Sequence, residues 1–196
     1  MIKIIMKISD IEYDGFIDRL LDMAKEHPEQ LNGAKIPPGA GKMLKMIPRQ
    51  QKNQMITDIL NRNKDAAIPQ IQQVLTAVMG PVAITDMDIS YDRNAACPVS
   101  FMIEASQIDT GYIINNVMPG FYVQENGQKI MGENYDGPLD LPSVQSYMRQ
   151  LDYRTAELLI ARGMSANKTR LMQDISSGFA GIGIQMQLKE LHLYVK

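Results

Sequence analysis

The feature that most constrains the fold of this chain is the alternation of apolar and polar residues near its start. Between residues 2 and 12 the apolar side chains recur at every second position: Ile2, Ile4, Met6 and Ile8. This spacing is that of one side of a β-strand. Because the intervening positions are more polar, such a strand buries one face, as is common in antiparallel sheets. Three further stretches have strand character, at 82–92, 98–108 and 182–195.

The segments between these strands have the periodicity of amphipathic helices. We predict helices over about 15–26, 48–63, 66–79, 110–118, 142–162 and 165–177. The strands over 82–92 and 98–108 are joined by a short turn, whereas helices connect the other strands. This order of elements favours an α+β fold. We therefore predict one globular domain over 1–196, with an antiparallel sheet of about four main strands and helices packed on one face.

Local signals refine this outline. Asn126-Gly127 stands between two short apolar pairs and predicts a tight β-hairpin. Gly163 fits the C-terminal cap of the helix that Pro142 begins, and Ser165 fits the N-cap of the next helix. In the last strand, the alternation slips in phase after Leu188, which predicts a β-bulge.

The two halves of the chain resemble each other. At an offset of 97, residues 2–21 align without a gap on residues 99–118, with identities at Ser9, Ile11 and Ile17. The order of strands and helices also repeats. We predict an internal duplication with repeats 1–94 and 97–196, related by a pseudo-two-fold axis.

Composition excludes several classes of protein. Hydrophobic residues make up 45% of the chain and charged residues 21%, which is typical of globular proteins. The net charge of −2 gives no strong nucleic-acid signal. Cys97 is the single cysteine, so the chain cannot form an internal disulfide framework, and we expect a cytoplasmic protein. No stretch is long and apolar enough to predict a membrane span.

Few residues suggest chemistry. Asp86 and Asp88 share one side of a strand and could contribute oxygen ligands to Mg²⁺ or Ca²⁺, but the sequence supplies no third ligand. Ser165 and Lys168 have the spacing of a serine acyl-enzyme motif, but its partner motifs are missing and helix capping explains the serine. We predict no catalytic residue, metal or cofactor, and favour a protein that is not an enzyme. An uncharacterised enzyme remains an alternative.

Charge is segregated along the chain. Residues 30–65 contain seven basic and two acidic residues, whereas residues 86–140 contain nine acidic and two basic residues. Such asymmetry can steer association between molecules. We predict a non-catalytic interaction module, either a homo-oligomer or a binder of another protein. We assign partner binding to a basic segment, which consists of Lys35, Lys42, Lys45, Arg49 and Lys52.

The methionines suggest a different function. The chain has 15 methionines and no tryptophan. Methionine fills irregular gaps and adapts to varied ligands. An apolar small molecule or lipid held between sheet and helices is therefore the alternative to a protein partner, and it would be contacted by Met148, Met164, Met172 and Met186.

Overall fold

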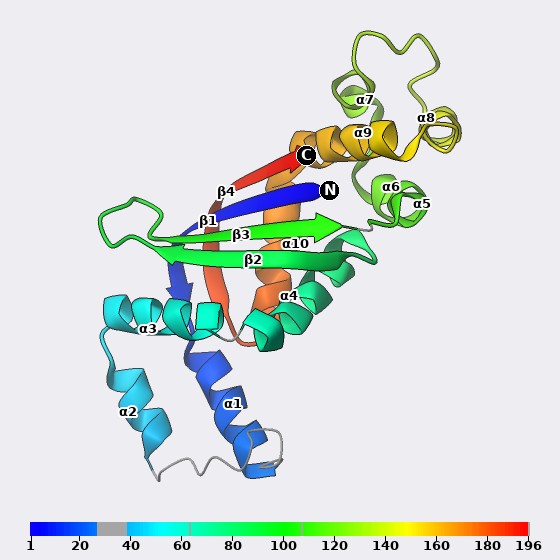
Figure 1. Cartoon of the computed structure of the whole chain (residues 1–196). Helices are drawn as coiled ribbons and strands as arrows, with labels where there is room; N and C mark the ends of the chain where they lie inside the picture. Colours follow the sequence, from blue (N-terminus) through cyan, green and yellow to red (C-terminus); the bar gives the residue numbers. More distant parts are fainter. Residues whose placement is uncertain (27–38, 63, 107, 196) are drawn as a thin grey trace.

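The computed structural model describes residues 1–26, 39–62, 64–106 and 108–195. Within these ranges the chain forms a four-stranded antiparallel sheet of order β2-β3-β1-β4, with helices packed on one face (Figure 1). The strands are β1 (Ile2–Glu12), β2 (Ala83–Tyr91), β3 (Val99–Ser106) and β4 (Gln185–Val195). The predicted α+β class and all four predicted strands are confirmed.

The helices fall into two groups along the chain. Between β1 and β2 lie α1 (Asp14–Glu26), α2 (Ala40–Met46), α3 (Arg49–Arg62) and α4 (Lys64–Met79). Between β3 and β4 lie α5 (Thr110–Tyr112), the π-helical turn η2 (Ile113–Val117), α6 (Met118–Phe121), α7 (Gln124–Met131), α8 (Leu141–Met148), α9 (Tyr153–Ala166) and α10 (Lys168–Gly181).

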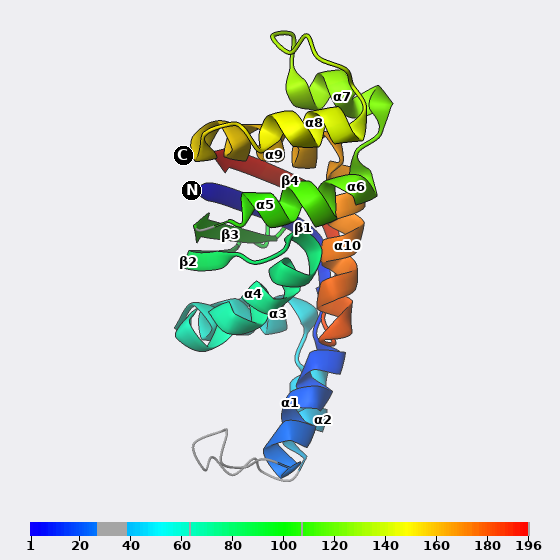
Figure 2. The same ribbon diagram turned by 90° about the vertical axis from the view of Figure 1, so that its right-hand side faces the viewer.

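The core lies between the sheet and the helices α4 and α10. These two helices pack against each other and against the edge strands β2 and β4 (Figure 2). Every second residue of β1 and β3 points into this layer, and the ring centroids of Phe101 and Phe179 are 6.3 Å apart across it. The burial of alternate apolar residues is what sets the register of the sheet.

The two edge strands carry matching irregularities. The pairing of β4 with β1 skips Lys189 just before Ile8, and the pairing of β2 with β3 skips Thr85 just before Ala105. The predicted bulge after Leu188 is therefore confirmed. Ile8 and Ala105 are 97 positions apart, which is the offset of the predicted repeat.

The offset of 97 positions also relates the two central strands, β1 and β3. Ile5 lies opposite Met102 in the middle of the β1–β3 pairing, and these residues are again 97 positions apart. A two-fold axis through this pair would exchange β1 with β3 and β2 with β4, which leaves the strand order unchanged. The sheet has the symmetry that a duplication would produce, while the duplication itself stays a prediction.

The predicted hairpin at Asn126-Gly127 is wrong, because these residues lie within α7. The side chain of Asn126 donates to Asn167, and Gly127 is buried where an added Cβ would come within 2.7 Å of the Tyr122 hydroxyl. Close packing, rather than a turn, accounts for this glycine. The neighbouring Ile130 is fully buried in the core, as the apolar side of a helix requires.

The predicted helix over 142–162 is wrong in its extent, because two helices occupy this region. Asp140 caps α8 by accepting from the Ser143 backbone, and Asp152 caps α9 by accepting from Thr155 in the same way. Gly163 is buried inside α9 and does not cap it, and Ser165 lies in the last turn of α9 rather than before α10. The caps are strong local signals for helix starts, and Asp152 divides the apolar stripe in two.

Helices α1 and α2 form an arm that projects from one end of the sheet, away from the other helices (Figures 1 and 2). The arm follows β1 directly and contains Lys42 and Lys45 of the predicted basic segment. The proline and glycine residues of 33–48 predict a loop with one short helical turn in this stretch. Helix α2 occupies Ala40–Met46, and the part before residue 39 lies outside the described residues.

Candidate functional site

The predicted basic segment lies along the arm and the first turn of α3. Lys35 falls outside the described residues, and Lys42 is exposed on α2. The Lys45 ammonium lies 2.6 Å from the carboxylate of Asp18 on α1. This ion pair raises the pKa of Lys45, chiefly through the hydrogen bond from its ammonium to Asp18.

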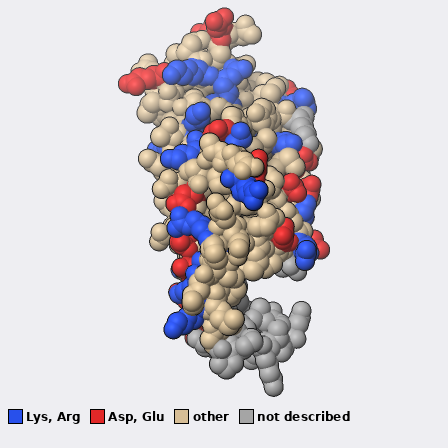
Figure 3. Space-filling model, turned by 90° about the vertical axis from the view of Figure 1, so that its left-hand side faces the viewer, with Lys and Arg blue, Asp and Glu red and all other residues tan. Residues whose placement is uncertain are grey.

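The other two basic residues also pair with acids of the same chain. Arg49 binds Asp10 at 2.6 Å and Glu12 at 3.1 Å, both near the end of β1. The Lys52 ammonium lies 2.7 Å from Asp14, and Lys52 is buried. Its hydrogen bond lowers the pKa of Asp14. In Figure 3, blue and red side chains accordingly alternate along one edge of the arm.

These ion pairs bear on the role of the basic segment. Three of its five residues are matched by acids at positions 10–18, in their own chain, and not by the acidic stretch 86–140. Lys64, which lies outside the basic segment, contacts that stretch through Asp86 at 3.5 Å. A neutralised segment exerts a weaker field on a partner than the sequence suggests, so binding by this segment stays an untested prediction.

The residues with candidate chemistry are not assembled into a site. Asp86 and Asp88 lie on the same face of β2, and among the described residues no group of three His, Cys, Asp or Glu side chains is placed to hold a metal ion. Ser165 and Lys168 are exposed on different helices, so their spacing does not form an acyl-enzyme motif. Neither pair supports a catalytic assignment.

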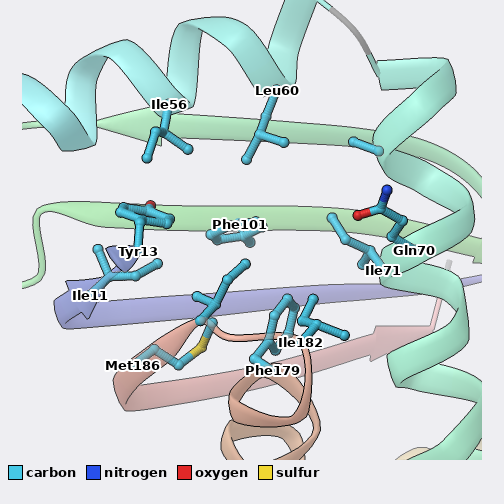
Figure 4. A pocket seen from close by; sticks show the side chains of 12 residues that line it. Ile11, Tyr13, Ile56, Leu60, Gln70, Ile71, Phe101, Phe179, Ile182 and Met186 are labelled. Carbon is cyan, nitrogen blue, oxygen red and sulfur yellow. The ribbon is translucent and has the colours of Figure 1, made fainter. Parts of the chain in front are cut away.

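An apolar cavity lies between the sheet and the helices α3, α4 and α10. Ile56 and Leu60 on α3 point toward Phe101, Ile71 and the other side chains that line it (Figure 4). Its volume is about 30 Å³, whereas pockets for small molecules measure roughly 300–1,000 Å³. The cavity has room for about one water molecule and none for a lipid in this conformation.

The methionines assigned to an apolar ligand do not share this cavity. Met148 and Met164 are buried in the core. Met172 and Met186 line a shallow groove between α10 and β4, and of the four only Met186 also lines the cavity. The structure therefore does not bring the four side chains together.

No described helix covers the second face of the sheet, which we call the open face (Figures 1 and 2). It consists of residues 3, 5 and 7 of β1, 86, 88 and 90 of β2, 100, 102 and 104 of β3, and 190, 192 and 194 of β4. These side chains are half-buried or exposed. Ile5 and Met102 form its apolar centre.

Strand pairing arranges the open face in three rows that cross the sheet. The first row is Tyr194, Lys3, Glu104 and Asp86. The central row is His192, Ile5, Met102 and Asp88. The third row is Glu190, Lys7, Ser100 and Ser90. An apolar centre within a polar rim is the composition of many protein interfaces.

Charged side chains on the open face are partly fixed by one another. Glu190 accepts from His192 at 3.0 Å and pairs with Lys7 at 3.2 Å. These contacts, the His192 hydrogen bond first, lower the pKa of Glu190. The rings of His192 and Tyr194 stack with their centroids 6.2 Å apart. Fixed side chains lose less conformational entropy when a partner binds.

Helices flank both edges of the sheet, so a partner's strand cannot simply be added there. Helix α9 packs against β4, and α3 packs against β2 (Figure 1). The carboxamide of Asn61 accepts from the Ile89 N–H at 3.0 Å and donates to the Ile89 carbonyl. Asn61 thus occupies the hydrogen-bonding groups that a further strand would use.

The open face is the surface that sequence reasoning missed. Its signal was present, because Lys3, Ile5 and Lys7 alternate with the buried residues of β1. Alternation alone could not say whether a second layer of helices covers these positions.

Comparison with known proteins identified no matching family model, no similar curated protein and no similar solved structure. In the described part of the chain, no helix has the length and apolar character needed to cross a membrane.

Proposed function

We propose that the protein is a non-catalytic interaction module and that the open face is its contact surface. The observation that carries this proposal is the position of Ile5 and Met102 at the centre of an uncovered sheet face. A face of mixed apolar and charged side chains suits contact with a folded protein, because the apolar centre is buried while the rim stays polar. The flanked edges direct contact to the face rather than to strand addition.

We also propose the cytoplasm as the place where this module works. The support is the single, partly buried Cys97, which cannot form an internal disulfide.

The proposed function is tested by affinity retention with three baits and amine cross-linking. The baits are the wild-type protein, Ile5→Glu on the open face, and Met43→Glu on the arm. Met43 is 72% exposed, so its variant controls for the added charge. We expect wild type and Met43→Glu to retain a protein, either another chain or the same one, that Ile5→Glu retains at least about tenfold less.

Cross-links locate the contact. Lys3 and Lys7 lie on the open face, while Lys42 is exposed on the arm. The proposal expects cross-links to the retained protein from Lys3 and Lys7. Equal retention by all three baits, or cross-links concentrated at Lys42, would contradict it. A urea unfolding curve for Ile5→Glu checks that the variant is folded.

A further inference from the structure

The charges of the open face are divided between its two halves. The half formed by β1 and β4 carries Lys3 and Lys7 with one acid, Glu190, whereas the half formed by β2 and β3 carries three acids, Asp86, Asp88 and Glu104. Because β1 and β3 are the two central strands, the division runs along the middle of the sheet. A face divided in this way complements a copy of itself if the copy is turned so that unlike halves meet.

Two symmetric ways exist to stack this face on a second copy with the strands of the two sheets aligned. If the two-fold axis runs across the strands, each strand lies over its own counterpart. Lys3 then meets Lys7 of the second copy, and Asp88 meets Asp88 of the second copy. Like charges in contact oppose association, so this arrangement is disfavoured.

If the two-fold axis runs parallel to the strands, β1 lies over β3 and β4 lies over β2 of the second copy. Each row then meets itself reversed. Lys3 lies over Glu104 of the second copy, and Ile5 lies over Met102 of the second copy. His192 lies over Asp88 of the second copy. None of the three rows then opposes two like charges.

We propose that the chain forms a homodimer in which two open faces stack with the two-fold axis parallel to the strands. This inference rests on the proposed function and names its partner as a second copy of this chain. Stacked sheets usually cross at about 30°, which leaves the central Ile5–Met102 contacts in place. The charged rows on either side fix the orientation of the two copies.

The size of the face places the dimer among small interfaces, which are typical of weak or transient contacts. β1 and β3 pair over Ile2–Ile8, and strand spacings of about 3.3 Å per residue and about 4.8 Å between strands give a face of roughly 20 by 20 Å. This is about half of the roughly 800 Å² that each partner buries in a standard interface. We therefore expect a weak dimer, with a Kd on the order of 10–500 µM.

The test is sedimentation velocity of the full chain from about 10 to 500 µM, a range that brackets the expected Kd. We expect concentration-dependent dimers for wild type and for the control Met43→Glu. His192→Glu places an acid over Asp88 of the second copy, and since the dimer contains this contact twice, we expect dimerisation to weaken about tenfold. Mixing His192→Glu with Asp88→Lys places a glutamate over a lysine at one contact and leaves the wild-type His192 over Asp88 at the other, so it should restore a mixed dimer.

A second pair of variants tests the same arrangement in case one of the first two variants does not fold. Lys3→Glu and Glu104→Lys each oppose like charges in their own dimers, whereas their mixture opposes unlike charges at both contacts. Circular dichroism establishes which variants are folded, and the mixing experiment uses the folded pair.

Several results would overturn the homodimer. Wild type could remain monomeric across the whole range, folded His192→Glu could dimerise like wild type, or neither mixture could associate more strongly than its components. A monomeric wild type that still cross-links through Lys3 and Lys7 to another protein would remove the homodimer and leave the interaction function standing. A monomer without such cross-links would remove both.

Discussion

Asn61 should be one of the most sensitive polar positions in this fold. Its side chain makes two hydrogen bonds to the backbone of Ile89, one from the N–H and one to the carbonyl. Ile89 lies on the edge strand β2 and is only 2% exposed. Substitution Asn61→Ala would leave a part-buried backbone donor and a part-buried backbone acceptor without these partners.

The cost follows from the two lost hydrogen bonds. Each contributes about 0.5–1.5 kcal/mol net, and leaving a buried backbone group unpaired costs about 1–3 kcal/mol. Alanine returns roughly 0.5 kcal/mol, because it favours the helical backbone of α3 more than asparagine does. We expect Asn61→Ala to lower the free energy of unfolding by about 2–3 kcal/mol, and the Tm by roughly 5–10 °C.

The assay is equilibrium unfolding in urea, followed by circular dichroism, with Gln54→Ala as the matched control. Gln54 is exposed on the same helix and its amide donates to Asp58 at 3.1 Å. Loss of this surface hydrogen bond should change stability by less than about 0.5 kcal/mol. If Asn61→Ala unfolds at the same urea concentration as Gln54→Ala, the reasoning about the β2 edge is refuted.

Two further predictions concern the connections between elements. Gly80 has a φ of +85°, and a Cβ there would lie 2.2 Å from the ring of Tyr112, whereas Gly39 has a φ of +84° with open space around it. Gly80→Ala should cost about 2–4 kcal/mol and Gly39→Ala about 1–2 kcal/mol in urea unfolding, and equal costs would contradict the contact with Tyr112. Lys52→Met should cost about 1 kcal/mol near neutral pH, because it removes a charge-assisted hydrogen bond to the partly exposed Asp14. Lys52 lowers the pKa of Asp14 below its usual 3.8. The stability that this pair contributes is therefore present above pH 3.8 and is lost as the pH falls through the lowered pKa. If the difference in unfolding free energy between wild type and Lys52→Met persists at about pH 2, the assignment is contradicted.

Much of the fold could be predicted from the sequence, because strands and helices are marked by patterns among residues close together in the chain. The alternation of Ile2, Ile4, Met6 and Ile8 fixes which side of β1 is buried, and the structure buries all four. The phase slip after Leu188 marks the skipped residue of β4, since an extra residue must shift the alternation. Predicted helices correspond to α1, α3, α4 and α10 for the same reason, because each shows an apolar stripe.

Other features depend on what lies nearby in space. In the sequence, Gly127 follows an asparagine as in a tight hairpin turn. In the structure it lies within α7, where the space next to Tyr122 is too narrow for a Cβ. The basic segment suggested a surface for partners, yet Lys52 is buried against Asp14, which is 38 positions away. A pattern along the chain shows the charge of a residue and not the partner that neutralises it.

The sequence by itself determined the strands, their buried sides, the bulge and most of the helices, because these depend on contacts between a residue and its near neighbours. Only the tertiary structure decided that the opposite face of the sheet lacks a covering helix, which polar groups close the β2 edge and how strand pairing arranges the charges of the open face in rows. These arrangements bring together residues such as Lys3 and Glu104, which are adjacent through strand pairing although about half the chain separates them. Strand order and layer packing are set by the summed burial of the whole core, which no single segment encodes.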